Sequence, residues 1–273
     1  MLLALLGAGA LTTAHFYAEP LRWAQAYLAR RYAWQRIRDL YLATALASYL
    51  LPFKMGIPLR VGLALQVTRL DPGSLVALMA ADGFIMLSCW SGIALAVGGV
   101  QAHSLLPRVD PAWLILAVFI LGLSLASFGY VRWRKRASDA PRFFGCGVGA
   151  VPIAIAIGVV DVLSYGPRHG LIALGMGLDP MRFWTWSALG IIATFSGILS
   201  GLPMGLLGYD GVLLASYTAA GAEPSKAVLV LLCNRLLSFA VAAGLGVPAA
   251  RRLGIGAGIH QYWRRLREMV RAE

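Results

Sequence analysis

Residues 42–67 read LATALASYLLPFKMGIPLRVGLALQV, an apolar segment that is interrupted near its centre by two prolines and two cations. Pro52 and Pro58 leave backbone groups without helical partners, and Lys54 and Arg60 carry charge. Unpaired backbone and charge that face lipid cost several kcal/mol each. The segment therefore predicts a site inside a membrane protein that is enclosed by protein or filled with water.

A second interruption, rich in glycine and proline, lies at residues 201–211 inside the next comparably apolar segment. The two interruptions are in register. Three pairs of residues are each separated by 152 positions: Gly56 with Gly208, Pro72 with Pro224, and Asp82 with Asn234. Paired broken segments in two halves of a chain are typical of transporters whose substrate site lies near the middle of the bilayer.

The composition is that of an integral membrane protein. Hydrophobic residues make up 59% of the chain and charged residues 13%, and the mean hydropathy is +0.72. The formal charge of +12 could suggest a nucleic-acid partner, but the basic residues cluster in short segments beside apolar stretches, as in cytoplasmic loops. We therefore expect an all-α membrane protein with no nucleic-acid partner. The isolated cysteines and histidines predict neither a metal nor another cofactor.

The apolar segments lie at residues 2–16, 41–67, 75–100, 112–131, 143–163, 184–220 and 227–247. Arginine and lysine are concentrated at residues 22–38, 132–142 and 251–271, which predicts that these regions are cytoplasmic. The N-terminus is then external and the C-terminus internal in a bacterial cytoplasmic membrane. We expect Arg38 and Arg136 inside, Gln101 and Gly166 outside, and residues 166–182 at the interface.

This orientation requires segments 41–67 and 184–220 each to enter and leave on one side. The sequence thus predicts a polytopic helix bundle with two re-entrant hairpins that dip from opposite faces. The halves, 1–111 and 143–248, form an inverted repeat within one transmembrane domain, 1–248, and a basic tail follows at 249–273. Alternating access between near-symmetric halves follows from such a duplication.

The run Pro52-Phe53-Lys54-Met55-Gly56-Ile57-Pro58-Leu59-Arg60, followed by Leu70-Asp71-Pro72-Gly73-Ser74, resembles a signature of the lysylphosphatidylglycerol synthase transmembrane family, or flippase-like domain family. Residues 201–235 resemble its second signature. Two positions depart from the family pattern, because Ile57 replaces the usual glutamate and Asp210 lies closer to its glycine. No aminoacyl-transferase domain follows in this sequence. The resemblance therefore implies lipid translocation without lipid modification.

Three cations are the candidates for binding a phosphate: Lys54, Arg60 and Arg235. Backbone amides at Gly56 and Gly208 could add an anion site at half-helix N-termini, and Asp210 and Asn234 complete the candidate set. Other readings stay open. Arg60 could snorkel to the interface, and Arg235 could form a structural ion pair with Asp82, Asp161 or Asp210. Asp82 and Asp161 are equally candidates for proton coupling, and Asp210 for a helix cap.

The leading hypothesis is a flippase or scramblase for an amphiphile with an anionic, phosphate-bearing head group. One alternative is a membrane-embedded lipid-linked transferase. Tight pairs of intramembrane acidic residues would favour it, and this sequence has no such pair. The other alternative is a non-catalytic subunit of a lipid-modifying enzyme. We expect the basic tail at residues 259–271 to lie on anionic lipid. A homo-oligomer or a lipid-synthesis enzyme as partner also stays open.

Overall fold

The computed structural model describes residues 1–28, 33–50, 56–68, 70, 72–102, 150–200 and 207–255. The described chain is helical and contains no strand. Its α-helices are α1 (Leu2–Arg22), α2 (Trp34–Leu50), α3 (Gly56–Thr68), α4 (Pro72–Ala102), α6 (Ala150–Gly175), α7 (Phe183–Leu199), α8 (Gly208–Ala219) and α9 (Pro224–Arg252). A π-helical turn, Trp23–Tyr27, follows α1, and a 3-10 turn, Pro180–Arg182, precedes α7.

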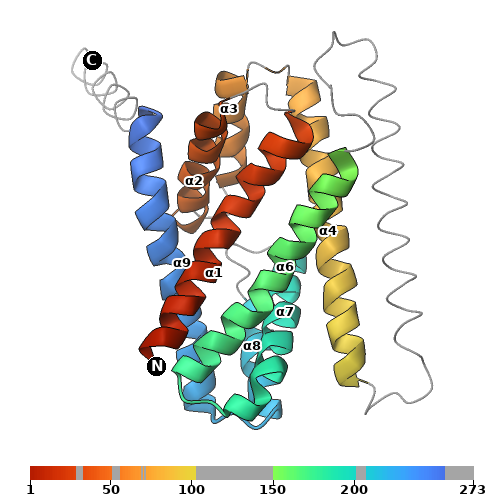
Figure 1. Ribbon diagram of the computed structural model, residues 1–273, viewed down its shortest axis with the longest axis vertical. Helices are drawn as coiled ribbons and strands as arrows, with labels where there is room; N and C mark the ends of the chain where they lie inside the picture. The colour runs from red at the N-terminus through yellow and green to blue at the C-terminus, as the bar shows by residue number, and fades with distance from the viewer. Residues whose placement is uncertain are drawn as a thin grey trace, which may run out of the picture.

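Two antiparallel helix pairs enter the bundle from opposite ends (Figure 1). In the α2/α3 pair, Arg60 Nε donates to Thr44 Oγ1 at 3.0 Å, and Gly56 lies against Ser48. In the α7/α8 pair, Tyr217 Oη donates to the carbonyl of Trp186 at 2.9 Å. The long helices α4 and α9 flank the pairs, and α1 packs against α6 across the middle of the bundle (Figure 1).

The 152-residue spacing marks matching helix boundaries in the two halves. Gly56 begins α3 and Gly208 begins α8, while Pro72 begins α4 and Pro224 begins α9. A proline at the first helical position costs no hydrogen bond, because that amide would have no helical partner. The repeat read from the sequence is therefore a repeat of helix starts.

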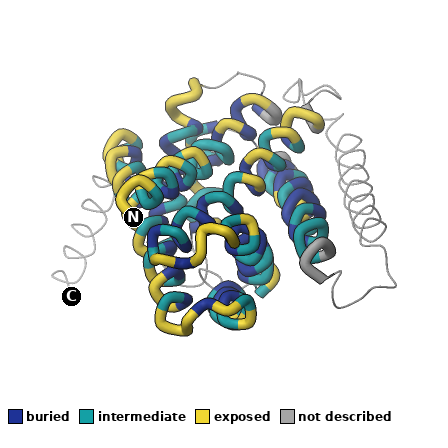
Figure 2. Tube along the Cα trace, turned by 60° about the horizontal axis from the view of Figure 1, so that its bottom comes forward, coloured by how far each residue is buried: buried dark blue, intermediate teal, exposed yellow. Residues whose placement is uncertain are grey.

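The outer surface of α9 is apolar, and its inner face carries small and polar residues. Val228, Leu229, Leu232, Leu236 and Phe239 are exposed at helical spacing, and Leu236 is 67% exposed. The opposite face buries residues that include Asn234, Ser238 and Gly246. This distribution is the reverse of a soluble helix and suits a lipid surround. Figure 2 shows the buried residues toward the inside of the bundle.

Two described helices are long and apolar enough to cross a bilayer, at Leu78–Gly98 and Pro224–Arg252. Together with the outward apolar stripe of α9, they identify an all-α membrane protein. The prediction of an all-α membrane protein is thus confirmed.

Residues 166–182 do not form a separate segment as predicted, because α6 continues through Gly166 and Pro167 to Gly175. Gly166 is buried within the protein. The glycines here allow α6 and α7 to pack closely instead of ending the helix. A Cβ at Gly170 would lie 2.6 Å from the ring of Phe183, and one at Gly166 would lie 3.0 Å from Ile191.

The first helix is also longer than predicted. We expected its apolar segment to end at residue 16 and Arg22 to lie in a cytoplasmic loop, but α1 runs to Arg22, which is only 2% exposed. The charges near this end are neutralised within the protein. Glu19 pairs with Arg60, and Arg22 pairs with Asp82. Similarly, α9 passes the predicted end at 247 and reaches Arg252, which pairs with Asp39 at 2.7 Å.

Several predictions lie outside the described residues. They concern residues 51–55 and 201–206 of the two interrupted segments, the segment 112–131 and the tail from 256 onward. Lys54 and Arg136 belong to this group.

Candidate functional site

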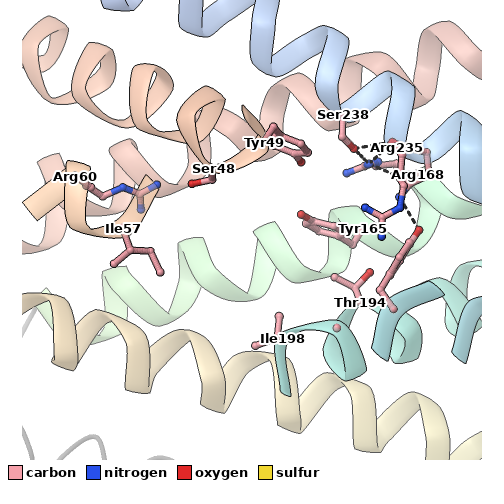
Figure 3. Close-up of a pocket in the computed structure, with 13 residues that line it drawn as sticks. Ser48, Tyr49, Ile57, Arg60, Tyr165, Arg168, Thr194, Ile198, Arg235 and Ser238 are labelled. Atoms are coloured by element: carbon pink, nitrogen blue, oxygen red, sulfur yellow. Dashed lines mark hydrogen bonds between the residues drawn. The ribbon is translucent and has the colours of Figure 1, made fainter. Parts of the chain in front are cut away.

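A cavity of about 430 Å³ lies where the two helix pairs meet. Both pairs contribute to its wall, together with α6 and α9. The lining residues are Ser48, Tyr49, Ile57, Arg60, Tyr165, Arg168, Thr194, Gly197, Ile198, Tyr209, Asn234, Arg235 and Ser238. We call this cavity the central pocket. In Figure 3, Arg168 and Arg235 lie together at one side of the pocket and Arg60 lies at the other.

Arg168 is the most deeply buried cation of the central pocket, with 3% of its surface exposed. Its Nη2 donates to Asn234 Oδ1 and to Ser238 Oγ, which are neutral partners. Its Nε is buried without a hydrogen-bond partner among the described residues. No described carboxylate forms an ion pair with it. A buried guanidinium in this state has both charge and a donor available for an anion.

Arg235 and Arg60 line the same pocket, but each faces a carboxylate. Arg235 donates to Asp210 Oδ1 from Nη2 at 2.5 Å and from Nε at 3.1 Å. Arg60 pairs with Glu19, and its guanidinium lies 4.4 Å from the centre of the Tyr41 ring. With three arginines and two partner carboxylates, the described side chains leave one positive charge at the pocket.

Two of the acids predicted as partners of these cations, Asp82 and Asp161, are found with other partners. Asp82 accepts from Arg22 Nε at 2.5 Å and from Nη2 at 3.0 Å, and Trp23 Nε1 donates to it at 3.1 Å. Asp161 instead bonds His15, with 2.6 Å between Oδ1 and Nδ1. Among the three acids considered for Arg235, Asp210 is the partner found. The carboxylates could not be assigned from the sequence, because their partners lie on other helices.

The cap predicted at Asp210 is also wrong. Leu207 occupies the N-cap position of α8, and no side-chain cap hydrogen bond is found among the described residues. Asp210 instead lies in the first turn of α8 and points to Arg235. Leu207 itself has φ of 66°, a conformation that costs a bulky residue of the order of 1 kcal/mol or more.

Gly56 and Gly208 act through their small size at the helix starts. A Cβ at Gly56 would collide with the Ser48 side chain. A Cβ at Gly208 would lie 2.7 Å from both the Ser196 carbonyl oxygen and Ser200 Cβ. Each glycine therefore lets the second helix of its pair start in contact with the first. Neither residue lines the central pocket.

A hydrogen-bond network surrounds Asn234. Its Nδ2 donates to Tyr209 Oη at 2.5 Å, and the same hydroxyl bonds His169 Nε2 at 2.9 Å. His169 Nδ1 lies 2.9 Å from the carbonyl oxygen of Tyr165. The network fixes Asn234, so its amide oxygen stays directed at Arg168. No group of three or more His, Cys, Asp or Glu residues suited to a metal occurs in the part of the chain that the structure describes.

Sequence reasoning missed Arg168, Tyr165 and Tyr209. Arg168 lies in segment 166–182, which we predicted from the sequence to lie at the interface. The signal that could have found it is the apolar run Leu171–Leu174 that follows, which places a cation between two apolar stretches.

Part of the chain is similar to a UPF0104 membrane protein of Methanothermobacter thermautotrophicus. The two sequences are 30% identical over 107 residues, which is 39% of this chain. The match spans 30% of the length of that relative. No family model and no solved structure match the chain.

Proposed function

We propose that the protein moves an amphiphile with an anionic, phosphate-bearing head group across the membrane, as a flippase or scramblase. The head group would occupy the central pocket, and the tails would stay in the bilayer. The observation that carries this proposal is Arg168, whose buried guanidinium faces neutral side chains and has an unpartnered Nε. A phosphate oxygen is a suitable acceptor for that group.

The arrangement of the helix pairs supports transport over mere binding. The α2/α3 and α7/α8 pairs enter from opposite ends, and both contribute to the pocket wall (Figure 1). In a bilayer, they would be re-entrant hairpins related by an inverted repeat. A pocket between such repeats can open to one side and then to the other when one half moves against the other.

The partial similarity to the UPF0104 membrane protein supports the same proposal. UPF0104 denotes the family of lysylphosphatidylglycerol synthase flippase-like domains, which the sequence signatures also resemble. In our proposal this chain shares the translocation activity that the word flippase describes. The roles of Arg60, Arg235 and Asn234 as head-group contacts are part of the same proposal, as are the bacterial inner membrane and a cytoplasmic C-terminus.

Reconstitution tests the proposal. The full chain is placed in liposomes that carry fluorescent phosphatidylglycerol in both leaflets, and an impermeant reductant then bleaches the outer leaflet. We expect bleaching beyond the outer-leaflet fraction, while protein-free liposomes stop at that fraction. Mass spectrometry of the extracted lipids should show no covalent change. A changed lipid mass would favour a transferase, and neither movement nor a mass change would favour a partner subunit.

A further inference from the structure

His15, Asp161 and Tyr165 form a hydrogen-bonded chain that ends at the central pocket. His15 on α1 contacts Asp161 Oδ1 through Nδ1 at 2.6 Å and Tyr165 Oη through Nε2 at 2.9 Å. The Asp161 side chain is 2% exposed and that of His15 is 26% exposed. Tyr165 lines the pocket, and its ring lies 5.2 Å from the Arg168 guanidinium. One imidazole thus links a buried carboxylate to the wall of the pocket.

Asp161 also lines a second cavity, of about 470 Å³, between α1 and α6. The carboxylate therefore lies between that cavity and the central pocket, with His15 and Tyr165 bridging to the latter. Proton relays in membrane proteins are commonly built from chains of His and acidic residues within the membrane helices. Imidazole is suited to the role because it gains and loses a proton in the physiological range.

The titratable and charged groups around this chain come from all of the helices packed on it. They are Tyr17 on α1, Tyr49 on α2, Cys89 on α4, Arg168 and His169 on α6, and Tyr209 and Arg235 beyond Tyr165 in the pocket. Arg22 and Asp82 also act on Cys89, and they pair with each other, while Asp210 faces Arg235. Asp161 and Arg168 both act electrostatically on Tyr165, so the charge of Asp161 reaches the wall of the pocket.

We propose that His15 and Asp161 form a proton-binding site whose occupancy sets the affinity of the central pocket for an anionic head group. This inference rests on the proposed function. With His15 neutral, the pair carries one negative charge behind Tyr165 and opposes the anion. With His15 protonated, the pair is neutral overall and no longer opposes the anion.

Linkage then works in both directions. If a bound proton strengthens binding of the anion, the bound anion strengthens binding of the proton by the same factor. Each head group that enters the pocket thus brings proton uptake at a pH where the pair is partly protonated. A protein with this property can use a proton gradient to bias the direction of lipid movement.

The test uses the full chain in detergent and a fluorescent short-chain phosphatidylglycerol, whose phosphodiester stays singly charged over the range studied. Anisotropy gives the affinity between about pH 5.5 and pH 8.5. We expect binding to weaken by at least about fivefold as the pH rises, a change within the usual range for coupled sites. Proton uptake on lipid addition is measured in the same wild-type sample with a pH dye in weak buffer.

Asp161→Asn removes the negative charge of the pair, so its affinity at about pH 8.5 should rise to that of the wild type at about pH 5.5. Asp179→Asn is the matched control, because Asp179 caps a surface turn, and it should keep the wild-type pH dependence. Phosphatidylglycerol binding that is independent of pH in the wild type, with no proton uptake, would overturn the proton site and leave the proposed function intact. Absence of phosphatidylglycerol binding at every pH would instead refute the proposed function. The uptake measurement decides the matter even if Asp161→Asn does not fold.

Discussion

In the first half of the molecule, Arg22 at the end of α1 reaches Asp82 on α4, and the two form a buried ion pair at 2.5 Å. In the second half, Arg168 on α6 reaches Asn234 on α9, which is the residue equivalent to Asp82 in the 152-residue repeat. Asp82 and Asn234 are equally buried, at 7% exposure. The halves thus share a helix arrangement and a buried arginine, and differ by one carboxylate.

This difference separates a structural contact from a candidate binding site. A carboxylate in the first half satisfies the arginine and ties α1 to α4. An amide in the second half holds the arginine in place through a hydrogen bond but leaves its charge in the central pocket. At these equivalent positions, Asp82 gives Arg22 a carboxylate partner, and Asn234 leaves Arg168 without one among the described residues.

The largest expected effect is on stability and comes from Arg22. Arg22→Gln should lower the free energy of unfolding by about 3–5 kcal/mol, because it leaves the Asp82 carboxylate buried without its arginine. Asp82→Asn in the same chain should restore most of the loss. Arg168→Gln, the matched change in the second half, should alter stability by only about 1 kcal/mol, since its partners are neutral. Unfolding in detergent measures all three, and equal losses for the two arginines would contradict the distinction.

Asn234→Asp makes the second half resemble the first. The new carboxylate should pair with Arg168 and weaken binding of anionic lipid by about tenfold or more, the equivalent of one charge-assisted hydrogen bond. Asn234→Ser, which adds no charge, is the control and should bind more tightly than the aspartate variant. Both proteins should remain folded. An aspartate variant that binds phosphatidylglycerol as well as the wild type would remove the reason for assigning the site to the second half.

The two helix starts allow a paired comparison of glycines. Gly56→Ala and Gly208→Ala should each destabilise by about 1–3 kcal/mol, because the added methyl group meets the neighbouring helix. Gly62→Ala and Gly211→Ala lie in the same two helices with open space around them, so they should stabilise by about 0.5–1 kcal/mol. Thermal unfolding of the four variants checks the signs. Loss of stability in all four would show that contact at the helix starts is not the cause.

The smallest effect is expected for the pair Arg235 and Asp210, which is about one-fifth exposed on both sides. Arg235→Gln or Asp210→Asn alone should destabilise by roughly 1 kcal/mol, and the double variant should regain the loss. Transport distinguishes the roles of Arg235. If Arg235 also contacts the head group, the double variant will be as stable as the wild type but will transport lipid more slowly. Full transport by that double variant would mark Arg235 as structural.

The sequence predicted the register of the two halves because glycine and proline act locally. Gly56, Pro72, Gly208 and Pro224 match at a fixed spacing of 152 residues, and in the structure each begins a helix. The all-α membrane class followed from composition in the same way.

Pairings could not be predicted, because they depend on tertiary contacts. Arg22 looked like a loop cation until its partner 60 residues away was known. Arg168 lies in a segment that we predicted from the sequence to lie at the interface, yet α6 runs through Pro167 to Gly175. The sequence found Arg60, Arg235, Asn234 and Asp210 at or beside the pocket. It did not identify Arg168, on which the proposed function depends.

The most direct measurement compares phosphatidylglycerol with zwitterionic phosphatidylcholine in liposomes that hold either the wild type or Arg168→Gln. We predict that the wild type moves phosphatidylglycerol faster than phosphatidylcholine, and that Arg168→Gln, equally well folded, loses the movement of phosphatidylglycerol by about tenfold or more. A folded Arg168→Gln protein that moves phosphatidylglycerol at the wild-type rate would contradict an anion site built on the uncompensated arginine of the second half.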